Sequence, residues 1–191
     1  MTNKVTVEAI MELLTIQKEF DERVPTRNIG DTTMAYFVEL FEWLNTVEHF
    51  KNWKTDPGKA KDVQLDELAD VLAFALSLLG QVEDELKAET DEDVVGSIAK
   101  ATVTGVNELS GYVNLENSVM SLGYIRILLT ELFTGTVPEM RPEVVAYYLS
   151  QPFVIADAYY TFDELIEAYK AKMSHNHARQ DGTVDKDKGY V

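Results

Sequence analysis

The 191-residue sequence contains no cysteine, which excludes disulfides, thiolate-bound zinc and cysteine nucleophiles and favours a reducing compartment. No apolar stretch approaches the roughly 18 residues that a membrane span requires. The segment Met1–Glu8 also lacks the basic and apolar parts of a signal peptide. These absences predict a soluble, cytoplasmic protein with no membrane partner.

Positive charge is also scarce, because 17 Lys and Arg stand against 33 Asp and Glu, for a net charge of −16. Such a surface repels nucleic-acid phosphates, so no nucleic-acid partner is expected. A small anionic ligand would need a bound metal ion or a local cluster of basic residues. The 46% hydrophobic and 26% charged residues are typical of a globular chain, and the length suits one domain over 1–191.

Apolar residues recur at helical spacing through most of the chain, which predicts an all-α helical bundle. Residues 88–113 indicate only a weak helix with loops, and Val103–Val106 and Val144–Tyr148 are the only candidate strands. Asp31 or Thr32 is expected to cap the second helix, and Thr161 with Glu164 forms a capping box before the last. The helices are predicted over residues 6–23, 31–52, 63–87, 115–133, 143–149, 153–159 and 161–177.

Two pairs of carboxylates lie on consecutive helices that are otherwise apolar. Glu39 and Glu42 are three residues apart on the second helix, and Glu67 and Asp70 repeat this spacing on the third. Residues three apart share one helix face, and a helix that is apolar nearly all round should be buried. The connection between the helices is short, which favours an antiparallel hairpin in which the two pairs face each other.

Four facing carboxylates would be costly without a cation, because burial and like charge both oppose ionisation. An all-oxygen set suits Mg²⁺ or Mn²⁺ rather than zinc, and such a site can hold phosphate oxygens and activate water. A single Glu-x-x-Glu is usually an exposed stripe paired with lysines. Two such pairs on neighbouring apolar helices favour a metal site between two antiparallel helices.

The acidic motifs resemble those of the all-α nucleoside triphosphate pyrophosphatases, the group that contains MazG and the dimeric dUTPases. The acidic motifs alone specify only this superfamily. Further segments resemble the dimeric dUTPases of phages and prophages of Gram-positive bacteria, and the resemblance is good over residues 10–80 and 160–182 but poor over 88–150. These segments are Phe50–Lys54, Leu65–Asp70 and Tyr169–Lys172 with Asn176, Arg179 and Gln180.

The resemblance implies that the protein hydrolyses dUTP to dUMP and pyrophosphate with a metal-activated water, with dUDP as a candidate second substrate. It assigns Mg²⁺, which Mn²⁺ can replace, to the two carboxylate pairs, Glu39, Glu42, Glu67 and Asp70. Glu39 is also the candidate to orient or deprotonate the attacking water. An enzyme that is phage-encoded would act in the host cytoplasm.

The resemblance also assigns phosphate binding to Lys172, Asn176 and Arg179, which share one helix face. The alternative is a solvated basic helix end that complements the helix dipole. Gln17 is assigned to the uracil edge and Trp53 to the face of the base. Plain surface exposure of Gln17 and hinge packing of Trp53 are equally good alternatives.

A homodimer is expected, since the resembling enzymes are dimers and the helices are too apolar for one chain to cover. Residues 88–150 are interpreted as a variable inserted region of the single domain. Two other functions remain open. One is a MazG-like pyrophosphatase of broader base specificity, and the other is a regulatory protein that binds a repressor partner through residues 88–140.

Overall fold

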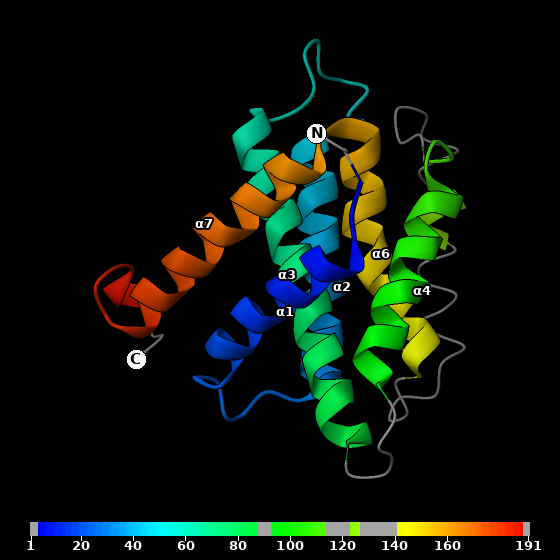
Figure 1. Ribbon diagram of the computed structural model, residues 1–191. Helices are drawn as coiled ribbons and strands as arrows, with labels where there is room; N and C mark the ends of the chain where they lie inside the picture. The colour runs from blue at the N-terminus through cyan, green and yellow to red at the C-terminus, as the bar shows by residue number, and fades with distance from the viewer. Residues whose placement is uncertain (1–3, 88–92, 114–122, 127–140, 189–191) are drawn as a thin grey trace.

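The computed structural model describes residues 4–87, 93–113, 123–126 and 141–188, and no strand occurs among them. The predicted all-α fold is therefore confirmed, and the two candidate strands lie within helices instead. The helices are α1 (Val7–Asp21), α2 (Ile29–Val47), α3 (Lys61–Leu86), α4 (Val94–Leu109), α6 (Pro142–Tyr159) and α7 (Phe162–Gln180), with a short 3-10 turn at Lys186–Lys188 (Figure 1).

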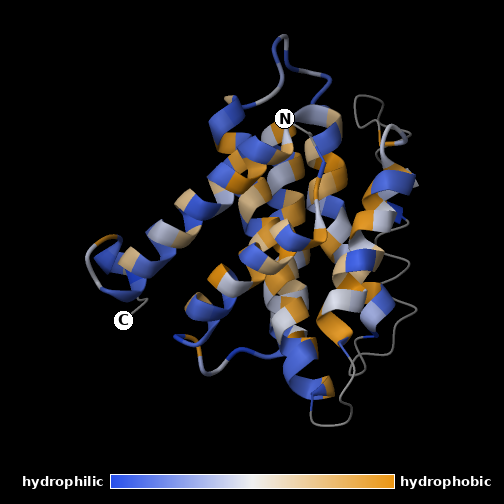
Figure 2. Cartoon of the chain, in the orientation of Figure 1, coloured by the Kyte–Doolittle hydropathy of each residue, from blue (hydrophilic) through white to orange (hydrophobic). Residues whose placement is uncertain are grey.

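Helix α3 is the centre of the bundle and packs against α1, α2, α4, α6 and α7. Its middle, from Leu68 to Val82, is almost continuously buried, as expected for a helix that is apolar on nearly every side. Figure 2 shows the apolar residues concentrated on these inner helices and the polar residues at their ends. The α2–α3 hairpin predicted from the sequence is present, and it positions the acidic pairs.

The ends of α2 differ from the prediction. Asn28, rather than Asp31 or Thr32, is the N-cap, because its side-chain oxygen accepts a hydrogen bond from the Asp31 amide at 2.9 Å. The helix ends at Val47 rather than at residue 52, because Glu48 adopts the left-handed conformation with φ 60°. At α7 the capping box of Thr161 and Glu164 is confirmed.

Glu48 also organises the loop that follows α2. The carboxylate is 1% exposed and accepts hydrogen bonds from Lys54, Lys51 and the Gly58 amide. These bonds lower its pKa to about 2, so it is ionised at any working pH. The loop is thereby tied back to the end of α2, while Trp53 at its tip is 71% exposed.

The segment predicted as two short helices is the single helix α6, which continues through Pro152. Proline has no amide hydrogen, so the carbonyl of Tyr148, four residues earlier, loses its helical partner. The buried Tyr36 of α2 replaces that partner, since its hydroxyl donates to the Tyr148 carbonyl at 3.1 Å. The two rings also stack, with centroids 5.1 Å apart.

We expect Tyr36→Phe to lower the free energy of unfolding by about 1–3 kcal/mol, the usual cost of leaving a buried acceptor unsatisfied. Urea unfolding followed by circular dichroism measures this. Tyr112→Phe is the control, because Tyr112 is 77% exposed and should change stability by less than about 0.5 kcal/mol. Equal midpoints for wild type and Tyr36→Phe would show that α6 does not depend on this bond.

One face of α2 is uncovered, contrary to the prediction that the helix is buried all round. Met34, Val38 and Phe41 are 65%, 46% and 43% exposed. Their spacing places them along one side of the helix. We call these three residues the apolar stripe.

Helix α4 and the predicted helix over residues 115–133 can also be compared with the structure. Helix α4 is stronger than the weak helix expected, because Asp93 caps it and Val95, Ile98 and Ala99 are buried in the core. Of the predicted helix 115–133, residues 123–126 are helical and the rest lies outside the described residues. None of the described helices is long and apolar enough to cross a membrane.

Candidate metal centre and adjoining pocket

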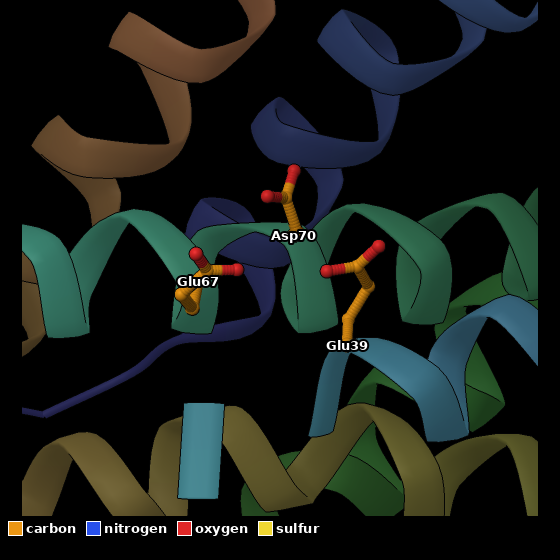
Figure 3. Close-up of side chains that lie close together, drawn as sticks. All are labelled: Glu39, Glu67 and Asp70. Carbon is orange, nitrogen blue, oxygen red and sulfur yellow. The ribbon is translucent and has the colours of Figure 1, made fainter. Parts of the chain in front are cut away.

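Three of the four predicted carboxylates converge between α2 and α3. Glu39, Glu67 and Asp70 each offer one oxygen, and these oxygens all lie within 4.8 Å of one another. Figure 3 shows Glu39 reaching from α2 toward Glu67 and Asp70, which project from neighbouring turns of α3. The three-residue spacing on α3 and the antiparallel hairpin together produce this cluster.

The electrostatics of the cluster call for a cation. Burial, followed by the charges of Asp70, Glu42 and Glu67, raises the pKa of Glu39 to about 7. Burial and the charge of Asp70 also raise the pKa of Glu67. The donors are carboxylate oxygens only, which matches the preference of a hard divalent ion. The residues present therefore fit the predicted metal.

Glu42 lies at the edge of this cluster. Its side chain is exposed, and it is not among the three residues whose oxygens converge. Its charge still raises the pKa of Glu39 and of Glu67, so it lies near both. Direct ligation by Glu42 stays a prediction.

Lys172 of α7 forms an ion pair with the cluster through Asp70. Its ammonium lies 2.6 Å from an oxygen of Asp66 and 2.6 Å from an oxygen of Asp70. Burial lowers the pKa of Lys172, but the hydrogen bonds to the two carboxylates outweigh burial and raise it overall. Burial also raises the pKa of Asp70, against the opposing effect of Lys172. The ammonium thus compensates part of the negative charge.

The other two residues of the predicted phosphate-binding set follow Lys172 along α7. Arg179 donates to the side-chain oxygen of Asn176 at 3.0 Å and to Asp185 at 2.7 Å. The positive charge of Arg179 opposes the rise in the pKa of Asp70 that burial causes, and Asn176 lines a cavity together with Asp70. The structure therefore brings all three together beside the carboxylates.

A cavity of about 320 Å³ adjoins the cluster and lies among α1, α2, α3 and α7. This volume is within the range of small-molecule sites, roughly 300–1,000 Å³. Asp70 and Asn176 line it on the side of the cluster, and Gln17 and Phe74 also line it. Gln17 is 3% exposed, which excludes the alternative that it is a plain surface residue. Trp53 does not line this cavity.

Several residues of the site were not identified from the sequence. Asp21 accepts a hydrogen bond from the Gln17 amide nitrogen at 2.8 Å, and both line the cavity with Ser77. Burial raises the pKa of Asp21, and hydrogen bonds from Gln17 and Ser77 oppose the rise. The four-residue spacing of Gln17 and Asp21 was a usable signal. No sequence pattern linked Asp66 to Lys172.

Comparison with known protein families decides the identity of this site. A family model described as dUTPase matches residues 9–183. The chain belongs to the dUTPase family. The comparison with curated proteins gives no match. As a dUTPase, the protein is an enzyme, a dUTP diphosphatase, and its fold and acidic cluster agree with the all-α members of that class.

The matched range contains every candidate site residue of this dUTPase, from Gln17 to Arg179, and it runs through residues 88–150 as well. The family uses a divalent metal, and the converging carboxylates are the described residues suited to hold one. The family resemblance inferred from the motifs is confirmed at this level. An origin in a phage stays a prediction.

Proposed function

We propose that this dUTPase hydrolyses dUTP to dUMP and pyrophosphate with Mg²⁺, that Mn²⁺ can replace Mg²⁺, and that dUDP is a second substrate. One observation carries the proposal: a cavity leads from the polar pair Gln17 and Asp21 to the carboxylate cluster at Asp70. A nucleotide has the same order of groups, with a polar base at one end and phosphates at the other.

We assign the ion to Glu39, Glu67 and Asp70, with Glu42 as a further ligand. A bound divalent ion supplies charge neutralisation for the phosphates and lowers the pKa of a water molecule. Glu39 faces the other two carboxylates from the opposite helix, and we assign it to orient and deprotonate the attacking water.

Lys172, Asn176 and Arg179 supply donors for the phosphates in this proposal. Lys172 now bonds Asp66 and Asp70, so it must exchange at least one of these partners for a phosphate oxygen. Asn176 lines the cavity together with Asp70, so it can reach a phosphate there without exchanging a partner at the carboxylates. Positioning and charge neutralisation are the main contributions that enzymes make to phosphoryl transfer.

A homodimer is supported by the apolar stripe, since an exposed row of large apolar side chains on one helix is typical of an interface. Trp53 does not line the cavity of its own chain, so we assign its contact with the base to the second subunit. Light scattering at micromolar concentration should give twice the chain mass. Val38→Lys should give the monomer mass, and a monomeric wild type would remove this assignment.

The test of the function is hydrolysis of dUTP, dUDP, dCTP, dTTP and UTP by the purified protein, with Mg²⁺ and with chelator. Magnesium-dependent turnover of the two deoxyuridine substrates alone is the expected result, with pyrophosphate from dUTP and phosphate from dUDP identified by ³¹P NMR. Turnover of several bases would instead establish the broader, MazG-like specificity.

A regulatory role is the alternative, because some phage dUTPases that the chain resembles also bind a regulatory repressor. The proposed surface is residues 88–140, of which 88–92, 114–122 and 127–140 lie outside the described residues. Deletion within this region with retained catalysis and lost partner binding would support the role. Absence of repressor binding by the intact protein would remove it.

A further inference from the structure

A chain of hydrogen bonds links Tyr169 of α7 to Gln17 and Asp21 of α1, two residues that line the cavity. The hydroxyl of Tyr169 lies 3.0 Å from the side-chain oxygen of Gln17, whose amide nitrogen lies 2.8 Å from Asp21. The exposed fractions of Tyr169, Gln17 and Asp21 are 0%, 3% and 5%. Buried polar groups are nearly always hydrogen-bonded, so the orientation of each group constrains the next.

The order of donors and acceptors in this chain has one consistent solution. The Gln17 amide nitrogen donates to a carboxylate oxygen of Asp21, so its side-chain oxygen faces Tyr169. The oxygen then needs a donor, and the hydroxyl proton of Tyr169 supplies it. Burial, with the charge of Asp21 adding, raises the pKa of the Tyr169 hydroxyl well above its usual range, so the proton is retained.

The hydroxyl also lies 3.2 Å from the carbonyl of Leu13, which is a possible competitor for the same proton. Leu13 is inside α1, where a carbonyl accepts a hydrogen bond from the residue four positions later. The Leu13 carbonyl is therefore satisfied without Tyr169. The Gln17 oxygen has no other hydrogen-bond donor among the described residues. Loss of the Tyr169 hydroxyl would therefore leave the Gln17 oxygen, rather than the Leu13 carbonyl, without a hydrogen bond.

The orientation of Gln17 determines which pyrimidine edge the cavity can match. With the nitrogen toward Asp21, the cavity presents a donor beside an acceptor, and uracil offers the complementary carbonyl oxygen beside N3–H. Cytosine in the same position offers an amino group and a bare N3, so both contacts are reversed. A flipped Gln17 would present its oxygen and would tolerate the amino group.

We propose that Tyr169 is a positioning residue for base selection, whose hydroxyl holds the Gln17 amide in the orientation that favours uracil over cytosine. This inference rests on the proposed function, in which Gln17 and Asp21 contact the base. Tyr169 itself touches Gln17 rather than the substrate. Its effect is therefore on the choice between substrates and not on the chemical step.

The test is Tyr169→Phe, with kcat/KM measured separately for dUTP and dCTP in Mg²⁺. We expect the dUTP-to-dCTP ratio to fall about tenfold or more, the effect of one hydrogen bond, with the loss on dUTP mainly in KM. Tyr36→Phe is the matched control, because it removes a buried hydroxyl that bonds a backbone carbonyl away from the cavity. Its ratio should equal that of wild type.

A double-mutant cycle separates positioning from a structural role. In a Gln17→Ala background there is no amide to orient, so adding Tyr169→Phe should leave the ratio unchanged. Two results would overturn the inference while leaving the dUTPase activity intact. One is an equal loss of kcat/KM on dUTP and on dCTP in Tyr169→Phe. The other is a change in the dUTP-to-dCTP ratio that is the same with Gln17 present and with Gln17→Ala. A wild type that uses dCTP as well as dUTP would instead overturn the proposed base selectivity, and this inference with it.

Discussion

Glu39→Gln should lower dUTP turnover by at least about 10³-fold, within the range that a general base contributes. The amide has the shape of the carboxylate but cannot take a proton from water, and it is a poorer ligand for a hard cation. Pyrophosphate release in saturating Mg²⁺ measures the loss. Glu19→Gln makes the same chemical change on an exposed part of α1 and should leave turnover unchanged. An active Glu39→Gln enzyme would refute the catalytic assignment.

The same substitution should stabilise the metal-free protein at alkaline pH. The folded-state pKa of Glu39 is about 7 against an ordinary 4.5, so the folded protein holds a proton that the unfolded chain has lost between these values. Stability of the wild type therefore falls as pH rises from 4.5 through 7. Glutamine carries no charge at any pH and avoids this loss.

The pKa shift of Glu39 corresponds to at most about 3 kcal/mol in the free energy of unfolding. We expect Glu39→Gln to gain about 1–2 kcal/mol of this, because Glu39 is only half-buried and solvent screens the neighbouring charges. Urea unfolding in chelator at pH 8 and at pH 4.5 measures the gain, which should be present at pH 8 and absent at pH 4.5. Glu19→Gln should show no gain at either pH. A gain of equal size at both values would contradict the electrostatic cause.

Lys172→Met should change stability in the opposite direction. Its ammonium compensates Asp66 and Asp70, and methionine removes the cation that is hydrogen-bonded to the largely buried Asp70. We expect a loss of about 2–3 kcal/mol in chelator at pH 8, slightly below the 3–5 kcal/mol of a fully buried broken pair. Turnover of dUTP should fall about 10²–10³-fold, as expected when one phosphate-stabilising donor is removed.

Lys170→Met provides a matched control on the same helix. Lys170 pairs with Glu12, but both side chains are substantially exposed, at 46% and 63%. Such a surface pair contributes about 0–1 kcal/mol, so stability and turnover should stay close to wild type. If Lys172→Met were as stable and as active as Lys170→Met, the ammonium would have no role at the carboxylates.

The comparison of Glu39 with Lys172 also shows what sequence periodicity can specify. The spacing of Glu67 and Asp70 places them on one helix face whatever the rest of the fold does, and the packing of α2 against α3 brings Glu39 opposite them. The partners of Lys172 depend instead on how α7 crosses α3. That crossing is set by side-chain packing between distant segments, so the Lys172–Asp66 pair had no local signal.

The errors in the fold have the same origin. Pro152 predicts a helix break by a local rule, but the hydroxyl of Tyr36, more than 100 residues earlier, satisfies the carbonyl that proline leaves free. Glu48 takes a left-handed conformation without being glycine because Lys51 and Lys54 hold its carboxylate. In both cases a tertiary contact overrides a local preference.

In the proposed function, the carboxylate cluster and the adjoining cavity form one nucleotide site. Crystals grown with Mn²⁺ and the non-hydrolysable imido analogue of dUTP would test it most directly by anomalous scattering. We predict manganese peaks bound by oxygens of Glu39, Glu67 and Asp70, with uracil against Gln17 and Lys172 turned to a phosphate. Manganese bound elsewhere, or a nucleotide outside the cavity with Lys172 still on both aspartates, would contradict the claim.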